Sequence, residues 1–197
     1  MTLNPNYLRK TDEELIQEFQ DTNDIQAYEA LVKRYKDPLV NFVFRFVGDR
    51  DVSSDIVQDT MIKFYLNKDA YKSLAKFSTW IYTIASNLAK NELRRQKRKR
   101  FLSIYGDDNE ETTPQYADNS IILPDKAADM NIKDKIIQKA LMKVKAVYRE
   151  VVILRDVQDF SYEEIAEITN LSLGTVKSRI NRGRAQLQKL LKDIYRE

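Results

Sequence analysis

The chain has 197 residues, of which 43% are hydrophobic, so it can bury a core and form one large domain or two small ones. It contains no cysteine and no histidine, which excludes disulfides, thiolate or histidine metal sites, cysteine nucleophiles and a Ser-His-Asp triad. No apolar run approaches the ~20 residues that a membrane-spanning helix needs, so we expect no membrane insertion and a cytoplasmic protein.

The net charge of +3 conceals an uneven distribution along the chain. Residues 1–100 hold 18 Lys/Arg against 14 Asp/Glu, and residues 131–197 hold 14 against nine. Residues 101–130 hold one against seven. Because basic surfaces attract phosphate, the pattern indicates two segments suited to nucleic acid on either side of an acidic segment.

The first helices are predicted from caps and apolar spacing. Residues 1–10 look loose, and Thr11 and Glu14 then form an S/T-x-x-E capping box that starts a short helix. Apolar spacing over residues 25–35 predicts a second helix. Pro38 predicts either the first turn of a new helix or a kink.

A helix with an acidic side is predicted over residues 51–67. Asp55, Gln58 and Asp59 lie one turn apart, away from the apolar side. Carboxylates in the first turn of a helix interact favourably with its dipole. For Asp55 we therefore give equal weight to that role and to contact with a partner. Asp59 lies too deep in the helix for the first explanation.

A long helix is predicted from Phe77 to about residue 100, after a loop at residues 67–76. Trp80 falls on its apolar stripe, which favours packing over base stacking for this side chain. The polar side carries Thr83, Asn87, Lys90, Asn91, Arg94 and Arg95. Residues 94–100 are basic at six of seven positions. A basic run is usually only a solvated surface, but positive charge combined with aromatic rings also suits single-stranded nucleic acid.

Residues 101–130 are rich in acidic residues and lack periodicity, which predicts a mostly disordered linker. Helical patterns resume over residues 131–145 and 147–157. There is no strand-like alternation of useful length, so we predict an all-α fold with two small helical domains joined by a flexible acidic linker.

The last stretch predicts a helix-turn-helix. Ser161 and Glu164 form a second capping box, and a new helix begins at Thr175 after a break. Its apolar stripe includes Val176 and Ile180, and Gly183 occupies a position in the same stripe without a side chain. A short helix, a turn and a basic second helix is the layout whose second helix enters the DNA major groove. On this stretch alone, the alternative is a basic amphipathic surface helix.

Three motifs together resemble bacterial RNA polymerase sigma factors of the extracytoplasmic-function (ECF) group. They are DVSSDIVQDTMIKFY at 51–65, FSTWIYTIASNLAKNELRR at 77–95 and YREVVILRDVQDFSYEEIAEITNLSLGTVKSRINRGRAQL at 148–187. A helix-turn-helix alone is weakly specific, whereas the three motifs in this order are very specific. The resemblance implies an N-terminal tail and short helix at 1–24, a sigma region 2 domain at 25–100, a linker at 101–130 and a sigma region 4 domain at 131–197.

The resemblance also implies roles for individual residues. Asp55, Gln58 and Asp59 match positions that bind the clamp helices of the largest polymerase subunit. The loop at 67–77 matches the loop that captures a flipped base of the minus-ten element. The minus-ten residues implied are Lys76, Phe77, Asn87, Lys90, Asn91, Arg94 and Arg95. The minus-thirty-five residues implied are Thr175, Lys177, Ser178, Arg179, Asn181, Arg182 and Arg184, of which Thr175 and Arg184 hold the DNA backbone.

Two departures from the family pattern leave points open. Thr83 stands where relatives often have Arg, so the minus-ten sequence preference is open. The sequence KVKAVY at 143–148 replaces a Leu-Pro turn, so the turn geometry is open.

The function that the resemblance implies is promoter-specific initiation of transcription. We expect core RNA polymerase and promoter DNA as partners, an anti-sigma factor as a further partner, and no metal or cofactor. The alternative is a helix-turn-helix regulator that acts without polymerase and has no use for Asp59. An enzyme is disfavoured because the chain has neither a carboxylate cluster with metal-loop spacing nor a Gly-rich phosphate loop.

Overall fold

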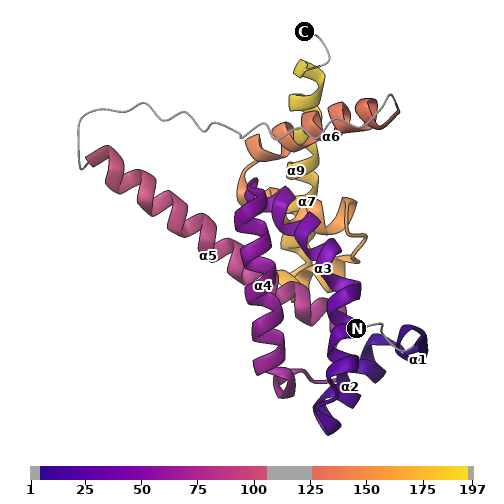
Figure 1. Cartoon of the computed structure of the whole chain (residues 1–197). Coiled ribbons are helices and arrows are strands. Elements are labelled where there is room, and N and C mark those ends of the chain that lie inside the picture. Colours follow the sequence, from indigo (N-terminus) through magenta and orange to yellow (C-terminus); the bar gives the residue numbers. More distant parts are fainter. Residues whose placement is uncertain (1–4, 106–125, 195–197) are drawn as a thin grey trace.

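The computed structural model describes residues 5–105 and 126–194, and every regular element in these two ranges is helical (Figure 1). The elements are α1 (Pro5–Arg9), α2 (Asp12–Thr22), α3 (Ile25–Val47), α4 (Arg50–Leu66), the 3₁₀ helix η1 (Lys68–Ala70), α5 (Phe77–Tyr105), α6 (Lys126–Lys143), α7 (Ala146–Asp156), α8 (Tyr162–Thr169) and α9 (Leu173–Ile194). The predicted all-α fold is confirmed for this part of the chain.

The N-terminal helices fold onto the rest of the protein. The predicted capping box starts α2, because the Thr11 hydroxyl accepts from the Glu14 N–H at 3.2 Å and the Glu14 carboxylate accepts from the Thr11 N–H at 2.7 Å. The buried side chains of α2 are Leu15, Ile16 and Phe19. The expectation that residues 1–10 are loose is wrong for residues 5–9, which form α1.

α3 continues through Pro38, so this residue does not begin a new helix. A proline inside a helix lacks an N–H donor and crowds the preceding turn, at a cost of ~3 kcal/mol. The helix tolerates it because Leu31, Leu39 and Phe42 are buried around it. Tertiary packing of an apolar face, rather than local preference, therefore sustains the helix at this point.

α3 ends at Gly48, which has a left-handed backbone with φ of +92° and donates its N–H to the Phe44 carbonyl at 2.8 Å. A Cβ at this position would lie 2.6 Å from Cε of Met142 on α6. The left-handed backbone therefore favours glycine, and a Cβ here would also require the flexible end of Met142 to move.

α4 and α5 pack with α3 around a cluster of aromatic rings. The Phe64 ring centroid lies 5.2 Å from that of Phe77 and 6.0 Å from that of Trp80. Trp80 thus packs against the core, as its place on the apolar stripe predicts. The C-terminal half of α5 projects away from the other helices in Figure 1.

Helices extend into both ends of the segment predicted as a linker. α5 continues to Tyr105 and α6 begins at Lys126, so residues 101–105 and 126–130 are helical. The acidic residues at 107–111 lie outside the described residues.

α8 and α9 form the predicted helix-turn-helix. In the capping box of α8, the Ser161 hydroxyl accepts from the Glu164 N–H at 3.1 Å and the Glu164 carboxylate accepts from the Ser161 N–H at 2.8 Å. α8 ends at Asn170 in a left-handed conformation, and α9 begins at Leu173, two residues before the predicted start.

The turn between α6 and α7, where the sequence left the geometry open, consists of Val144 and Lys145. Val144 is buried, and the Arg149 guanidinium donates to the Met142 carbonyl of the last turn of α6 at 3.2 Å. The arginine therefore closes the end of α6 in place of a proline turn.

α7 joins the two groups of helices, α1–α5 and α6–α9. All residues from 149 to 154 are buried, and a helix that is buried all round needs neighbours on more than one side. α9 of its own group and α3 of the first group both pack against it. The buried residues of the two groups form one continuous cluster, a contact that the prediction of two linked domains did not include.

Two glycines of α9 provide a matched test of this packing. A Cβ at Gly183 would lie 2.5 Å from Cγ2 of Val152 and 3.2 Å from the Tyr148 carbonyl oxygen, whereas a Cβ at Gly174 would meet nothing within 4 Å. Gly183→Ala should lower the free energy of unfolding by about 1–3 kcal/mol, because overpacking outweighs the better helix preference of alanine. Gly174→Ala should leave it unchanged or raise it by up to ~1 kcal/mol. Urea denaturation of both variants measures the difference, and equal stabilities would contradict the close packing of α7 and α9.

Candidate nucleic-acid and polymerase interface

The acidic side of α4 faces solvent. Asp55, Gln58 and Asp59 are exposed, and the opposite side buries Ile56 and Phe64 against the core. Within residues 5–105 and 126–194, neither carboxylate forms an ion pair. The N-cap of the helix is Asp49, which accepts from the Val52 N–H at 3.0 Å, so capping does not account for Asp55.

The exposed side of α4 becomes apolar toward its end. Ile62 and Leu66 are exposed by 54% and 71%, and they follow Asp55 and Asp59 at helical spacing. The helix therefore presents a stripe of carboxylates that continues into aliphatic side chains. A stripe of this kind suits a partner helix that carries both basic and apolar groups.

The connection between α4 and α5 has one exposed apolar tip. Leu74 is 96% exposed, whereas Tyr71 is buried and donates its hydroxyl to the Ala75 carbonyl at 2.8 Å. Phe77, a predicted minus-ten residue, is 0% exposed and packs among the aromatic rings of the core. Its side chain cannot contact DNA in this conformation.

The polar side of α5 carries exposed Asn87, Asn91, Arg94 and Arg95. Arg94 donates to the Asn91 side-chain oxygen at 3.0 Å, and Arg95 donates to the Glu92 carboxylate at 2.6 and 3.0 Å. The Arg95 guanidinium holds the pKa of the Glu92 carboxyl below its usual range. These contacts lie within one helix at the surface, so replacing them with phosphate contacts involves only a small loss of energy.

Lys90, also predicted to bind the minus-ten element, pairs with the second group instead. Its Nζ lies 3.4 Å from the Glu150 carboxylate of α7, and the Ser86 hydroxyl of α5 donates to the same carboxylate. Glu150 is only 4% exposed. This part of the α5 polar side is therefore covered by α7.

Further contacts between α5 and the second group of helices lie along the same helix. The Tyr82 hydroxyl donates to the Gln158 side-chain oxygen at 2.7 Å, and its ring centroid lies 4.7 Å from that of Phe160. Lys76, the remaining predicted minus-ten residue, forms an ion pair with Glu164 of α8 at 2.8 Å. We call the contacts of Lys76, Tyr82, Ser86 and Lys90 with α7, α8 and their connection the interdomain contact.

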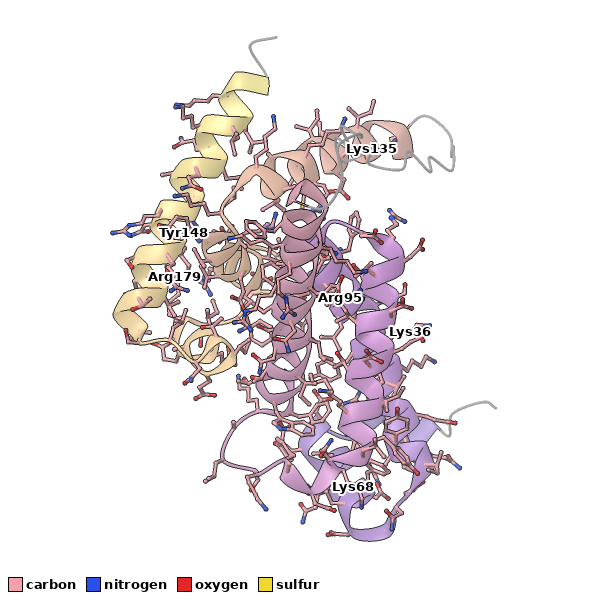
Figure 2. The ribbon with its side chains drawn as sticks, turned by 90° about the vertical axis from the view of Figure 1, so that its left-hand side faces the viewer. Lys36, Lys68, Arg95, Lys135, Tyr148 and Arg179 are labelled. Atoms are coloured by element: carbon pink, nitrogen blue, oxygen red, sulfur yellow. The ribbon has the colours of Figure 1, made fainter. Side chains whose placement is uncertain are left out.

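The basic side of α9 remains open. Lys177, Ser178, Asn181 and Arg182 are exposed and Arg179 is half-buried, while Val176 and Ile180 of the same helix are buried. In Figure 2 Arg179 lies on α9, at the opposite side of the view from Lys36 of α3. The arrangement brings together five of the seven predicted minus-thirty-five residues on one accessible surface.

The other two predicted minus-thirty-five residues have partners in the protein. The Thr175 hydroxyl lies 2.8 Å from the Ser172 hydroxyl, and Ser172 also accepts from the Thr175 N–H at 3.3 Å. Arg184 forms a two-point contact with Asp156 of α7, at 3.0 Å for its Nε. Thr175 thus helps to start α9, and Arg184 helps to hold it on α7.

Sequence reasoning missed Glu150, Ser86 and Tyr82. A signal for Glu150 was present, because it directly precedes the apolar run VVIL at 151–154, and a charge that is buried with such a run needs a partner. The identity of that partner, Lys90, depends on tertiary structure that local periodicity does not contain.

Among the described residues, no group of three or more Asp or Glu side chains is arranged to hold a metal ion. In the same part of the chain, no helix combines the length and apolar character that crossing a bilayer requires.

Family models match both helical groups. The model for Sigma-70 region 2 matches residues 31–99, and the model for Sigma-70, region 4 matches residues 134–187. The first match contains the exposed side of α4 and most of α5, and the second contains the helix-turn-helix.

Curated relatives match most of the chain. The ECF RNA polymerase sigma factor SigW of Bacillus subtilis is 34% identical over 173 residues, which cover 87% of this chain and 92% of the relative. The ECF RNA polymerase sigma-E factor of Escherichia coli is 32% identical over 187 residues, which cover 94% and 97%.

Solved structures agree on the fold. The sigma factor RpoE of Bartonella quintana, solved with the anti-sigma factor NepR, has a TM-score of 0.66 and 29% identity over 85% of this chain and 98% of that one. CnrH, solved with the cytosolic domain of CnrY, has a TM-score of 0.67 over 92% and 97%, and at 22% identity it supports the fold alone. The order of the two regions and the identity to relatives over most of their length show that the chain belongs to the ECF group of RNA polymerase sigma factors.

Proposed function

We propose that the protein, which as an ECF sigma factor directs promoter-specific initiation of transcription, divides this work between two domains. Residues 25–100 bind core RNA polymerase and the minus-ten element, and residues 131–197 bind the minus-thirty-five element. Residues 1–24 extend the first domain, and residues 101–130 contain the connection. The observation that carries the proposal is the exposure of two distinct surfaces, the acidic side of α4 and the basic side of α9.

Asp55, Gln58 and Asp59 form the contact with polymerase in this proposal. The carboxylates of Asp55 and Asp59 have no ion-pair partner within the described residues and are exposed to solvent, as is the Gln58 amide. A basic partner surface gains charge-assisted hydrogen bonds from them, and opposite charge also speeds association. Ile62 and Leu66 add apolar area at the end of the same stripe.

Lys76, Asn87, Lys90, Asn91, Arg94 and Arg95 bind the minus-ten element in this proposal. The arginines lie on the projecting part of α5 and hold phosphates, and the amides of Asn87 and Asn91 reach bases. Phe77 is buried, so we assign its side chain to holding the start of α5 rather than to DNA contact.

Lys177, Ser178, Arg179, Asn181 and Arg182 face the minus-thirty-five element, and Thr175 and Arg184 lie beside the DNA backbone. Arg and Lys read guanine and Asn reads adenine in the major groove, at about 1–3 kcal/mol of discrimination for each good pair. The contact of Arg184 with Asp156 leaves the arginine half-exposed, so it can hold a phosphate only by sharing or leaving that carboxylate.

The interdomain contact requires a change before the minus-ten element can bind. Lys90 and Ser86 are turned toward Glu150, and Lys76 is paired with Glu164. The second domain must therefore leave α5 when polymerase and promoter bind. The connection between the domains keeps their separate contacts effectively intramolecular during that step.

The remaining assignments rest on the family. The family consists of transcription initiation factors, and we infer that this member has no catalytic activity and acts in the cytoplasm. The similar RpoE of Bartonella quintana was solved with an anti-sigma factor, and we infer a partner of that class here. A helix-turn-helix regulator that acts without polymerase remains the alternative function for the residues of α9.

Asp59→Arg separates these two functions. The substitution places a positive charge against a basic partner surface, so we expect binding to core polymerase to weaken by more than about a hundredfold. Asp37→Arg, at an exposed position of α3, is the control and should bind normally. Pull-down with core polymerase measures both. Equal binding of the two variants would contradict the polymerase contact and favour the polymerase-independent regulator.

Arg182→Ala tests the recognition helix. We expect a loss of about 1–3 kcal/mol of discrimination at one base pair of the minus-thirty-five element, because a side chain that reads a base edge is removed. Lys189→Ala, at an exposed position farther along α9, should keep the full discrimination. Transcription from a promoter library with core polymerase measures the preference at each position, and an unchanged profile for Arg182→Ala would remove this residue from the interface.

Glu150→Gln tests the interdomain contact. The substitution keeps the shape and the acceptor for Ser86 but removes the counter-charge of Lys90, so the minus-ten side of α5 should become more accessible. We expect the free protein to bind a single-stranded minus-ten oligonucleotide about tenfold more tightly. Glu167→Gln, an exposed position on α8, is the control with the same change of charge. Fluorescence anisotropy measures the affinities, and equal values for both variants would show that the contact does not restrict access.

A further inference from the structure

The loop at residues 67–76, which we call the minus-ten loop, contains little structure of its own. It consists of η1 and an exposed tip at Lys72, Ser73 and Leu74. Its internal hydrogen bonds are short-range, such as the Ala70 N–H to the Asn67 carbonyl at 2.9 Å. The Tyr71 hydroxyl also bridges the tip by donating to the Ala75 carbonyl at 2.8 Å, but hydrogen bonds this local leave the position of the loop to its neighbours.

α2 contacts the first half of this loop. The side-chain amide of Gln20 donates to the Lys68 carbonyl at 2.7 Å and to the Tyr71 carbonyl at 3.1 Å. These two carbonyls belong to the beginning and the end of the η1 turn. One side chain of α2 therefore fixes both ends of that turn.

Lys68 of the loop in turn donates hydrogen bonds to α2. Its Nζ donates to the Phe19 carbonyl at 2.9 Å and to the Gln20 carbonyl at 2.7 Å, and it lies 5.1 Å from the centroid of the Phe19 ring. Phe19 and Gln20 lie in the last turn of α2, where the helix dipole favours a positive charge, and the Phe19 carbonyl also accepts from the Asn23 N–H at 3.1 Å. Figure 2 shows Lys68 at the end of the molecule where Figure 1 places α2 and the α4–α5 connection.

α2 also contacts the end of the loop. The Glu13 carboxylate accepts from the backbone N–H of Phe77, the first residue of α5, at 3.2 Å. The N–H groups in the first turn of a helix have no partner within the helix, and a carboxylate at this end is favourable. The five residues between Tyr71 and Phe77, which include the exposed tip, are thus held at both ends by one helix.

We propose that Gln20 and Glu13 are positioning residues for the minus-ten loop, and that α2 determines which base the loop accepts. The inference rests on the minus-ten role proposed above for this loop. Neither side chain needs to touch DNA. By fixing the two ends of the tip, they lower the entropy that capture of a base must remove, and they fix the pocket shape on which discrimination between bases depends. This gives the N-terminal helix a part in promoter selection.

The first test is Gln20→Met in the full chain with core polymerase. Methionine has a similar length and volume but no donor, so both carbonyl contacts are lost without a change of charge. The readout is the rate of open-complex formation on promoters randomised in each element. We expect discrimination at one minus-ten position to fall by about tenfold to a hundredfold, as for other displacements of a binding group by remote changes. The minus-thirty-five preference and the affinity for polymerase should not change.

Gln17→Met is the matched control, because Gln17 is exposed on the same helix. If Gln20→Met lowers transcription equally from all promoters and keeps the wild-type discrimination, α2 has only a structural role and the proposal is wrong. If the wild-type protein itself shows no minus-ten preference with polymerase, the proposed function of the loop is wrong as well. The two failures are therefore distinguishable.

A second pair of variants covers the possibility that Gln20→Met does not fold. Glu13→Ala removes the acceptor at the start of α5 and should relax the same minus-ten discrimination. Glu13→Gln keeps an acceptor oxygen and should retain the discrimination. Equal profiles for these two variants would overturn the role of Glu13.

Discussion

The closed arrangement of this protein depends on the buried carboxylate of Glu150. Burying a charge is unfavourable unless ion pairing and hydrogen bonds compensate, and here both come from α5 of the first domain, through Lys90 and Ser86. Such a pair contributes little net stability but determines the relative position of the surfaces that it joins. Separating the two groups would return both charges to water, but it would also expose apolar side chains of the core that the groups share. In the closed form Lys76 and Lys90 are paired with the second domain, whereas Asn87, Asn91, Arg94 and Arg95 stay exposed.

Local signals predicted the elements, and long-range contacts limited what could be predicted about the site. The capping box of Ser161 and the apolar spacing of Val176 and Ile180 involve residues one or two turns apart, so the helix-turn-helix followed from the sequence. The exposure of Asp59 followed in the same way. The partner of Lys90 is 60 residues away in sequence, at Glu150, and no periodic pattern contains that information.

Some features of the structure had a signal in the sequence that the prediction did not use. Phe77, Ile81 and Ala85 are spaced by four residues and all are fully buried, so helical periodicity already placed Phe77 in the core. Phe101 begins an apolar stretch that continues the helix rather than the linker. The continuity of α3 through Pro38 had no such signal, since it depends on the burial of residues on either side of the proline.

The residue after α3 is subject to a backbone constraint and to a packing constraint. Left-handed helix ends at Asn23 and Asn170 are formed by asparagine, which tolerates this backbone, whereas α3 uses Gly48. The backbone explains the difference, since φ is +92° at Gly48 but only +57° and +54° at the two asparagines. A Cβ at Gly48 would in addition lie 2.6 Å from Cε of Met142, so this side chain of α6 would have to move. Asparagine, which forms the other two helix ends, would here strain the backbone and displace a side chain at the contact between α3 and α6.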